Sequence, residues 1–269
     1  GLDIESLVTQ LISAERSPVE TRLVARESAL TAELSGFGSL KSALSTFQDS
    51  ISSLNKLSSF GQRTTTSSNT DAVVASANST AASGSYSLSV SQLASAHSLA
   101  STGYASTSDV VGTGTLTIRF GSTDYTSPDP GPESYDGFTV NPEKGAATIT
   151  IDSDNNTLTG VRDAINGAKI GVTAVIVNDV SGYRLLIGSD DGGEKNSLEI
   201  SVTDTGDSND LDSAGLSALS FNGSATNLAQ TVAARDALFT VNGLSIRSSE
   251  NRASGVIEGL DITLKDVTG

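Results

Sequence analysis

The chain contains one histidine, His97, the side chain best suited to proton transfer near neutral pH. A serine-based catalytic triad would need His97 beside a serine and a carboxylate. The segment around His97 is so rich in Ser and Ala that a neighbouring serine carries no information. We therefore interpret His97 as a surface or edge residue and assign it no catalytic role.

Acidic residues between 152 and 163 have part of the spacing of a calcium-binding loop. Asp152, Asp154 and Asn156 stand at its first, third and fifth positions, and Asp163 stands at its twelfth. However, Thr157 replaces the required Gly, and Asp replaces the usual Glu at the last position. We favour Asx turns at the end of a strand, leading into a helix cap.

Other motifs that carry chemistry are missing from the sequence. There is no Cys, which excludes disulfides, thiolate zinc sites and a cysteine nucleophile. The glycines form neither a dinucleotide-binding nor a P-loop pattern. We interpret the acidic segments at 190–191 and 204–212 as loops, and a weak, non-specific cation site is the alternative. We predict that the protein is not an enzyme and has no cofactor or metal site.

Composition limits the classes of partner. The formal net charge is -15 and the pI about 4.3, which disfavours binding to nucleic acid. No basic amphipathic stretch or long apolar run suggests contact with a membrane. Hydrophobic residues make up 36% and aromatics 4% of the 269 residues, low for one large core. We expect two or three domains with several small cores.

Residues 1–60 are predicted to be helical because apolar residues recur at spacings of three and four. Pro18 is predicted to end one helix or open the next. The second helix carries a heptad seam, and Gly36 and Gly38 weaken the helix where it begins. One helix cannot bury so narrow a stripe, so we predict a partner helix from a missing segment or a second subunit, with a self-packed hairpin as the alternative. The seam consists of Phe37, Leu40, Leu44, Phe47, Ile51 and Leu54.

A linker is predicted at 61–68, and beyond it apolar residues alternate as in half-buried strands. Asn242-Gly243 between alternating apolar residues predicts a hairpin with a type I′ turn. A short helix is predicted at 158–165, and 104–146 and 204–231 are expected to be loop-rich edges of a separate lobe. Strands are predicted at 86–90, 116–120, 147–151, 172–177, 183–187, 198–203 and 260–264.

Four segments resemble bacterial flagellar cap proteins, also called filament cap proteins or hook-associated protein 2, in the order found in that family. They are GLDIESLVTQLISAERSPVE (1–20), GSLKSALSTFQDSISSLNKLSSF (38–60), TLTGVRDAINGAKIGVTAVIVNDVSGYRLLIGS (157–189) and DALFTVNGLSIRSSENRASGVIEGLDITLKDVTG (236–269). Together they cover 110 of the 269 residues.

The resemblance implies an α+β multidomain fold that lacks the C-terminal helices of the family. A helical coiled-coil leg at 1–60 would be followed by two mainly antiparallel β head domains, the second inserted into the first. We place the first head domain at 69–103 and 232–269, and the inserted one at 104–231. In the family the missing C-terminal helices pair with the N-terminal ones, which would explain the unpaired seam.

The resemblance also implies a function. Cap proteins are secreted through the flagellar export apparatus and form a ring-like homo-oligomer, commonly a pentamer, at the extracellular tip of the flagellum. They retain exported flagellin and promote its folding and polymerisation. Hook–filament junction proteins are further implied partners, and some members of the family bind host mucin.

Three other functions remain open at this point. A flagellin-like or junction filament subunit would share the helical leg and the β head. An adhesin that binds mucin or glycans would use the segment 104–231. A secreted hydrolase with a helical anchor is disfavoured, because the sequence has no constellation of His and clustered carboxylates.

Overall fold

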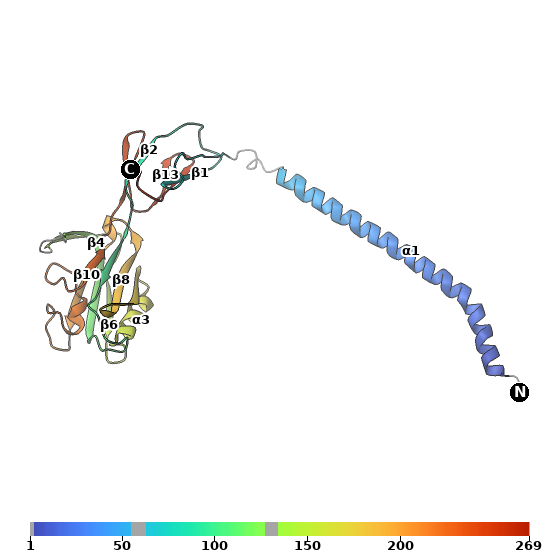
Figure 1. Cartoon of the computed structure of the whole chain (residues 1–269), viewed down its shortest axis with the longest axis horizontal. Helices are drawn as coiled ribbons and strands as arrows, with labels where there is room; N and C mark the ends of the chain where they lie inside the picture. The colour runs from blue at the N-terminus through green and yellow to red at the C-terminus, as the bar shows by residue number, and fades with distance from the viewer. Residues whose placement is uncertain (1–2, 55–62, 127–133, 269) are drawn as a thin grey trace. The chain divides into compact units, whose positions relative to one another are not determined.

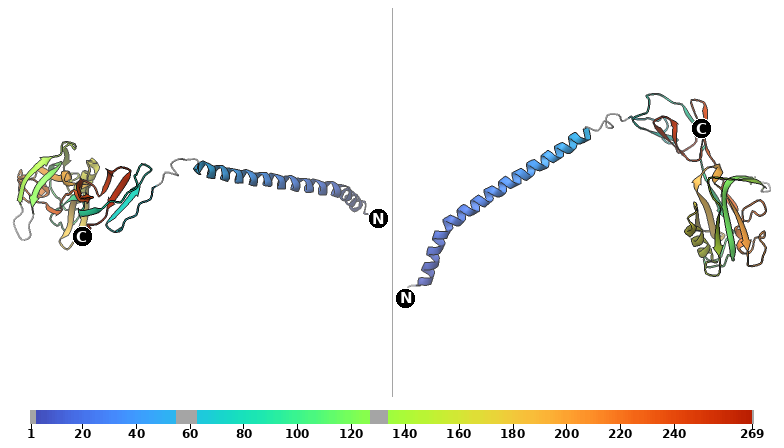
Figure 2. Two further views of the ribbon diagram at one scale, coloured as in Figure 1. Left: turned by 90° about the horizontal axis from the view of Figure 1, so that it is seen from above. Right: turned by 180° about the vertical axis from the view of Figure 1, so that it is seen from behind.

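The computed structural model describes residues 3–54, 63–126 and 134–268. The chain divides into two compact units, Gly1–Gln62 and Arg63–Gly269. Among the described residues, the first unit holds one long helix, and the second holds strands β1 to β14, a short helix and two 3-10 helices (Figures 1 and 2). Every strand pair that the structure describes is antiparallel, which confirms the predicted α+β class.

Helix α1 (Ile4–Leu54) has 51 residues, which corresponds to a length of about 76 Å at 1.5 Å per residue. Its N-terminus is capped by Asp3, whose Oδ1 accepts the Ser6 N–H at 3.2 Å. The helix predicted for 1–60 is therefore confirmed over this range, and residues 55–60 lie outside the described residues.

The prediction that Pro18 ends one helix or opens the next is wrong, because Pro18 lies inside α1. Proline lacks an N–H and crowds the carbonyl one turn earlier, which bends a helix without necessarily ending it. Two side chains donate to carbonyls at this point, Thr21 Oγ1 to Ser17 O at 2.7 Å and Arg22 Nε to Pro18 O at 3.2 Å. Figures 1 and 2 show α1 bending in its dark blue N-terminal part.

The first β lobe consists of two three-stranded sheets with the orders β1-β14-β13 and β12-β11-β2. Asn242 and Gly243 join β11 to β12 with φ angles of 49° and 82°, the two positive values that the predicted type I′ turn requires. The strands are β1 (Val73–Ala77), β2 (Leu88–Gln92), β11 (Ala237–Val241), β12 (Leu244–Ser248), β13 (Arg252–Ile257) and β14 (Leu260–Leu264). Their inward side chains form one core, including Val90, Phe239, Val241, Ile262 and Leu264.

The second β lobe lies between β2 and β11 in the chain, which confirms the predicted insertion. One sheet has the order β10-β3-β8-β7, and the other is built on β4, which pairs with β5, β6 and β9. The strands are β3 (Ala96–Ala100), β4 (Gly114–Thr126), β5 (Ser134–Val140), β6 (Ala147–Ile151), β7 (Val172–Asp179), β8 (Gly182–Gly192), β9 (Ser197–Asp204) and β10 (Ala229–Val232). Both sheets contribute to a second core, including Leu99, Leu116, Ile118, Leu185, Ile187 and Ile200.

Helix α3 (Leu158–Ala168) confirms the predicted short helix and packs against β6 and β7. Thr157 is its N-cap, and the Thr157 Oγ1 accepts the Gly160 N–H at 3.1 Å. Its buried face consists of Leu158, Val161 and Ile165, at the spacing of one helical face.

The expectation that 104–146 and 204–231 are loop-rich edges is wrong in part. Strand β4 extends to Thr126 and pairs with β5, because hydrogen bonding along a hairpin compensates for its weak apolar pattern. The 3-10 helix η2 (Gly215–Leu219) places Leu216 and Leu219 in the second core. Residues 127–133, between β4 and β5, lie outside the described residues.

The position of β3 bears on the division between the β domains. The sequence-based division assigned 69–103 to the first β domain. In the structure, β3 is hydrogen-bonded to β8 and β10, and Leu99 is fully buried in the second core. We propose that the change of lobe lies at the bridge between Ser95 and Arg235.

Candidate functional site

The strongest candidate site is the apolar seam on α1. The described seam side chains are those of Phe37, Leu40, Leu44, Phe47 and Ile51, and they are 49–69% exposed. Leu54 ends α1, and its side chain lies outside the described residues. Apolar residues of the seam recur every 3.5 residues on average, slightly less than one turn of an α-helix. Such a stripe drifts around a straight helix, so a partner helix can cover all of it only if the two helices wind around each other as in a coiled coil.

The exposed stripe is longer than the predicted seam. Exposed apolar side chains also occur toward the N-terminus, mostly three or four residues apart but with gaps of eight and seven after Leu11 and Leu23. They include Ile4, Leu7, Leu11, Val19, Leu23, Leu30 and Leu34. Exposed apolar side chains gathered in this way are typical of a protein–protein contact.

The free energy of burying apolar side chains explains why such a stripe favours association with a partner. Covering one Leu, Ile or Phe side chain contributes about 1.5–3 kcal/mol, and α1 leaves this contribution unused along the seam. A Cβ added at Gly36 or Gly38 would meet nothing within 4 Å, so packing within this chain does not require glycine there. The two glycines thus lower helix propensity where the seam begins without a local packing reason.

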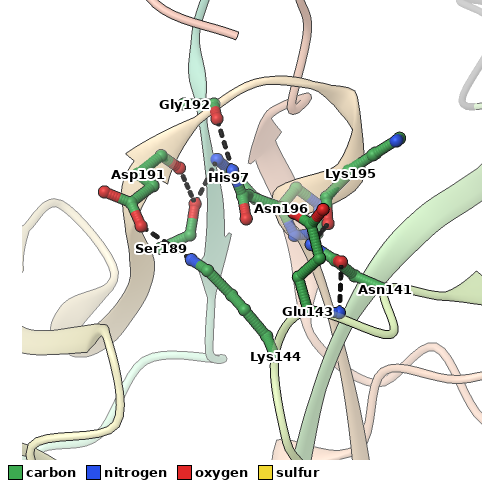
Figure 3. A network of polar contacts seen from close by, with 9 residues as sticks. All are labelled: His97, Asn141, Glu143, Lys144, Ser189, Asp191, Gly192, Lys195 and Asn196. Atoms are coloured by element: carbon green, nitrogen blue, oxygen red, sulfur yellow. Dashed lines mark hydrogen bonds and ion pairs between the residues drawn. The ribbon is translucent and has the colours of Figure 1, made fainter.

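His97 is not the surface or edge residue that we expected. It is 1% exposed, in β3, with its ring between β9 and β10 (Figure 3 shows its surroundings). Nδ1 accepts the Leu198 N–H at 2.8 Å, so Nε2 carries the proton and donates to Gln230 Oε1 at 2.8 Å. Burial lowers the pKa of His97 from 6.5 to about 4, against the opposing effect of the Gln230 hydrogen bond. Both ring nitrogens are used in holding strands together.

A polar network near His97 joins two turns of the second lobe (Figure 3). The His97 N–H donates to Ser189 Oγ at 2.9 Å, and Ser189 Oγ donates to the Asp191 carbonyl at 2.9 Å. Lys144 Nζ lies 2.7 Å from Asp191 Oδ2, which ties the turn after β5 to the end of β8. These contacts hold the backbone of a turn or join two elements of the lobe, so the network is structural.

The Asx-turn interpretation of residues 152–156 is confirmed. The Asp152 carboxylate accepts the Asp154 N–H at 2.9 Å, and the Asn155 side chain accepts the Asp152 N–H at 2.7 Å. The acidic loop after β9 is similar, since buried Asp204 accepts the N–H groups of Gly206 and Ser217. In the part of the chain that the structure describes, no group of three or more acidic, His or Cys side chains could hold a metal ion.

The first lobe has a groove with a volume of about 750 Å³. It lies between the edge strands β1 and β2, and apolar side chains such as Val73, Leu88 and Ile262 line it. Arg63 is the one charged residue among its described lining residues. Polar residues such as Thr65, Asn69 and Tyr86 also line the groove, so it is not the predominantly apolar pocket that typically binds a small molecule.

The fold belongs to the α+β class. A long, exposed helix with a heptad pattern precedes two antiparallel β lobes, and the second lobe is inserted into the first. No helix among the described residues has both the length and the apolarity of a membrane span. The family model described as "Flagellar hook-associated protein 2 N-terminus" matches residues 1–97.

Relatives and solved structures extend the match. The chain is 33% identical to the B-type flagellar hook-associated protein 2 of Pseudomonas aeruginosa over 99% of its own length and 53% of the relative. It is 35% identical to flagellar hook-associated protein 2 of Escherichia coli, over 94% and 49%. Among solved structures it resembles the D1-D2-D3 domains of the Escherichia coli flagellar cap protein FliD, with a TM-score of 0.68, 34% identity and coverage of 88% of this chain and 60% of the other.

A second structure, the D2-D3 domains of the same Escherichia coli protein, gives a TM-score of 0.62 and 33% identity over 77% of this chain and 93% of the other. The chain belongs to the flagellar hook-associated protein 2 family, the flagellar cap proteins. It spans about half the length of the curated relatives that it matches.

Proposed function

We propose that this chain is the leg helix and β head of a flagellar filament cap protein. It acts at the extracellular tip of the flagellum, after secretion through the flagellar export apparatus, as a structural and assembly protein. The observation that carries the proposal is the exposed heptad seam of α1, on a chain whose solved relatives are flagellar cap proteins.

The seam Phe37, Leu40, Leu44, Phe47, Ile51 and Leu54 holds the leg together in the assembled cap. Its apolar side chains pack into holes on a second helix, and this burial supplies most of the association energy. The opposite face of α1 is polar and contacts flagellin or neighbouring legs. A polar contact of modest strength suits a cap that must be displaced as each subunit is added, because affinity is tuned mainly through dissociation.

The cap is a ring-like homo-oligomer, with a pentamer as our expected stoichiometry. The β head forms the plate that retains exported flagellin and gives it space to fold and polymerise. The absence of Cys suits passage through an export channel, since no disulfide can lock a premature fold. Contacts with hook–filament junction proteins accompany the start of assembly.

Complementation of a capless strain tests the role of the seam. A full-length gene that carries Leu44→Asp and Ile51→Asp should fail to extend filaments and should release flagellin monomers into the medium. Two charges on the seam oppose its burial in a helix pair, because an unpaired charge resists transfer from water. Filament length by electron microscopy and flagellin in the supernatant are the measurements.

The matched control is Leu44→Met with Ile51→Leu, which keeps the seam apolar and close to its volume. This control should restore normal filaments at the same level of secreted cap protein. Normal filaments in the Asp variant, with equal secretion, would exclude the seam from the mechanism.

A filament subunit of the flagellin or junction type is the alternative with the same helix-and-head fold. A subunit of this kind would polymerise into long filaments, whereas a cap should form small closed rings or remain monomeric. Analytical ultracentrifugation with negative-stain electron microscopy separates the two. An adhesin function predicts saturable mucin binding by the segment 104–231, which a glycan array measures.

A further inference from the structure

Two chain segments link the β lobes, and they lie side by side. Leu93–Ser95 leads from β2 into β3, and Ala233–Asp236 leads from β10 into β11. The Ser95 N–H donates to the Arg235 carbonyl at 2.9 Å, and the Arg235 N–H donates to the Ser95 carbonyl at 3.1 Å. Because β2 pairs with β11 and β3 pairs with β10, a two-stranded ribbon continues from one lobe into the other (Figure 1).

Side chains reinforce this ribbon. The Asn251 side chain, in the loop between β12 and β13, accepts the Ala94 N–H at 2.7 Å and donates to the Ala94 carbonyl at 2.9 Å. The amide of Asn251 thus replaces the strand partner that Ala94 lacks at this point. Gln92 Nε2 donates to the Asp236 carbonyl and Ser95 Oγ to the Ala233 carbonyl, both at 2.7 Å.

A turn of the second lobe reaches the first lobe beside the ribbon. The Glu194 N–H donates to Asp236 Oδ1 at 2.8 Å, a hydrogen bond strengthened by the charge of the acceptor. Arg247 of β12 lies 3.0 Å from Glu194 Oε2 and 3.5 Å from Asp236 Oδ2. The Asp236 side chain is only 14% exposed, whereas that of Arg247 is 61% exposed. The Asp236 hydrogen bond is therefore the better shielded of these contacts.

Gly193 permits this close approach. Its φ of +97° is unfavourable for a residue with a side chain. A Cβ at Gly193 would lie 2.6 Å from the Ser249 Cβ and 2.9 Å from Asp236 Oδ1. Any other residue here would push the turn of the second lobe away from the first.

We propose that Gly193, Asp236, Arg247 and Asn251 form a polar clasp that fixes the two β lobes in one orientation. Lobes joined by two chain crossings and a small polar contact are expected to move relative to one another. The clasp removes this freedom, because the crossings are paired with each other and shielded hydrogen bonds hold the flanking turn. The inference stands independently of the filament-cap proposal, since it concerns only residues 63–269.

Spin labels on the full chain test the clasp. The chain has no Cys, so Val180→Cys in the second lobe and Leu244→Cys in the first can be labelled specifically, and both native side chains are exposed. Pulsed electron paramagnetic resonance should give one narrow distance distribution. Gly193→Ala or Asp236→Ala should at least double its width, whereas Asp261→Ala, which removes an exposed ion pair within the first lobe, should leave it unchanged.

A broad distribution in the parent chain would overturn the proposal, as would an unchanged narrow one in both clasp variants. Circular dichroism must show folded lobes before a distribution is interpreted. If Gly193→Ala fails to fold, Asp236→Ala and Asn251→Ala provide the same test without steric strain, and both should broaden the distribution.

Discussion

His97 lies in β3, and its two ring nitrogens connect this strand to two others in the second lobe. Protonation would add a proton to one of these nitrogens. Nδ1 accepts from Leu198 of β9, Nε2 donates to Gln230 of β10, and the ring lies 5.6 Å from that of Phe221. A second proton on the ring would leave two N–H groups facing each other at Nδ1. The neutral form is therefore the one compatible with the fold.

The pKa of His97 predicts a loss of stability in mild acid. Burial lowers the pKa to about 4 in the folded state from 6.5 in the unfolded state. The unfolded state thus binds more protons between these values, so stability is complete above pH 6.5 and falls as the pH drops toward 4. The slope approaches about 1.4 kcal/mol per pH unit. Urea unfolding at pH 7.5 and at pH 5 measures it.

The variant His97→Gln removes the titrating group and serves as the comparison. It should be less stable at pH 7.5, because one side-chain amide cannot reproduce both hydrogen bonds in place. Its stability should change less between the two pH values than that of the parent chain. Equal pH dependence in both proteins would contradict the assignment to His97.

A partly buried ion pair allows a second prediction at a single pair of residues. Arg119 and Glu199 lie directly opposite on β4 and β9, and Arg119 Nε donates to Glu199 Oε2 at 2.6 Å. The Glu199 side chain is nearly buried, whereas that of Arg119 is partly exposed. Arg119→Met should therefore destabilise the chain by about 3 kcal/mol, since it leaves a buried charge unpaired.

The double variant Arg119→Met with Glu199→Leu should recover most of the lost stability, because it also removes the unpaired charge of Glu199. Free energies of unfolding from urea titrations of the parent, both single variants and the double variant measure the coupling. Additive effects of the two substitutions would show that the pair is not coupled.

Sequence patterns predicted these residues unequally. A helix cap among Asn155, Asn156 and Thr157 and a turn at Asn242-Gly243 follow from local chemistry, which a few neighbouring residues determine, and the structure selects Thr157 as the cap. The burial of His97 depends on strands β9 and β10, more than 100 residues further along the chain. A short alternation of Ala96, Ser98 and Ala100 with His97 and Leu99 was the available signal, and its small side chains made it weak.

At the scale of the element, α1 is a helix with two glycines in its interior. Helix propensity favours Ala over Gly by about 1 kcal/mol per residue. Because a Cβ at Gly36 or Gly38 meets open space, Gly36→Ala with Gly38→Ala should stabilise α1 in the isolated chain. Amide hydrogen exchange should slow severalfold between residues 30 and 45.

Ser35→Ala is the control, because its smaller change in propensity should slow exchange less. Faster exchange in the Ala variants would contradict the open environment of the glycines. The same substitutions in a complementing full-length gene also show whether a partner needs the glycines, since filaments would then shorten although the helix is more stable.

The elements were predictable where their apolar period was strong. The long helix, α3 and the strands around Leu116, Ile149 and Ile262 were found from period alone. Strands β1, β5 and β13 were missed because residues such as Ala75, Gly137 and Gly255 interrupt the alternation. Their pairing partners, rather than their own sequences, determine these strands.

For the whole molecule, both hydrophobic cores lie in the second unit. The described residues of α1 contribute no side chain to either core. Deletion of residues 1–62 should therefore leave the melting temperature of the β unit within about 2 °C of the parent value, because the buried apolar area is unchanged. Differential scanning calorimetry of the fragment 63–269 and of the full chain measures this.

A lower melting temperature for the fragment would mean that α1 stabilises the β lobes. The control deletion is residues 1–17, which removes the helix only up to Pro18 and should also leave the transition unchanged. Unchanged transitions in both deletions would mean that the β lobes do not depend on α1. They would support the proposal that another helix covers the seam of α1.

The arrangement of the lobes was only partly predictable. The insertion of one β domain into the other followed from the family resemblance. The position of β3 did not, because its partners β8 and β10 are far away in sequence. The clasp is a contact of the same kind, since Gly193, Asp236 and Arg247 have no shared local pattern.

The bridge between Ser95 and Arg235 has a consequence for how this fold can vary. It places both ends of the inserted lobe at one hydrogen-bonded pair, where facing Cα atoms in antiparallel strands are about 5.5 Å apart. A guest domain whose own termini meet at that spacing can replace residues 96–234 without rerouting the host strands. The bridge is thus a suitable point at which a foreign domain can be grafted onto the first lobe.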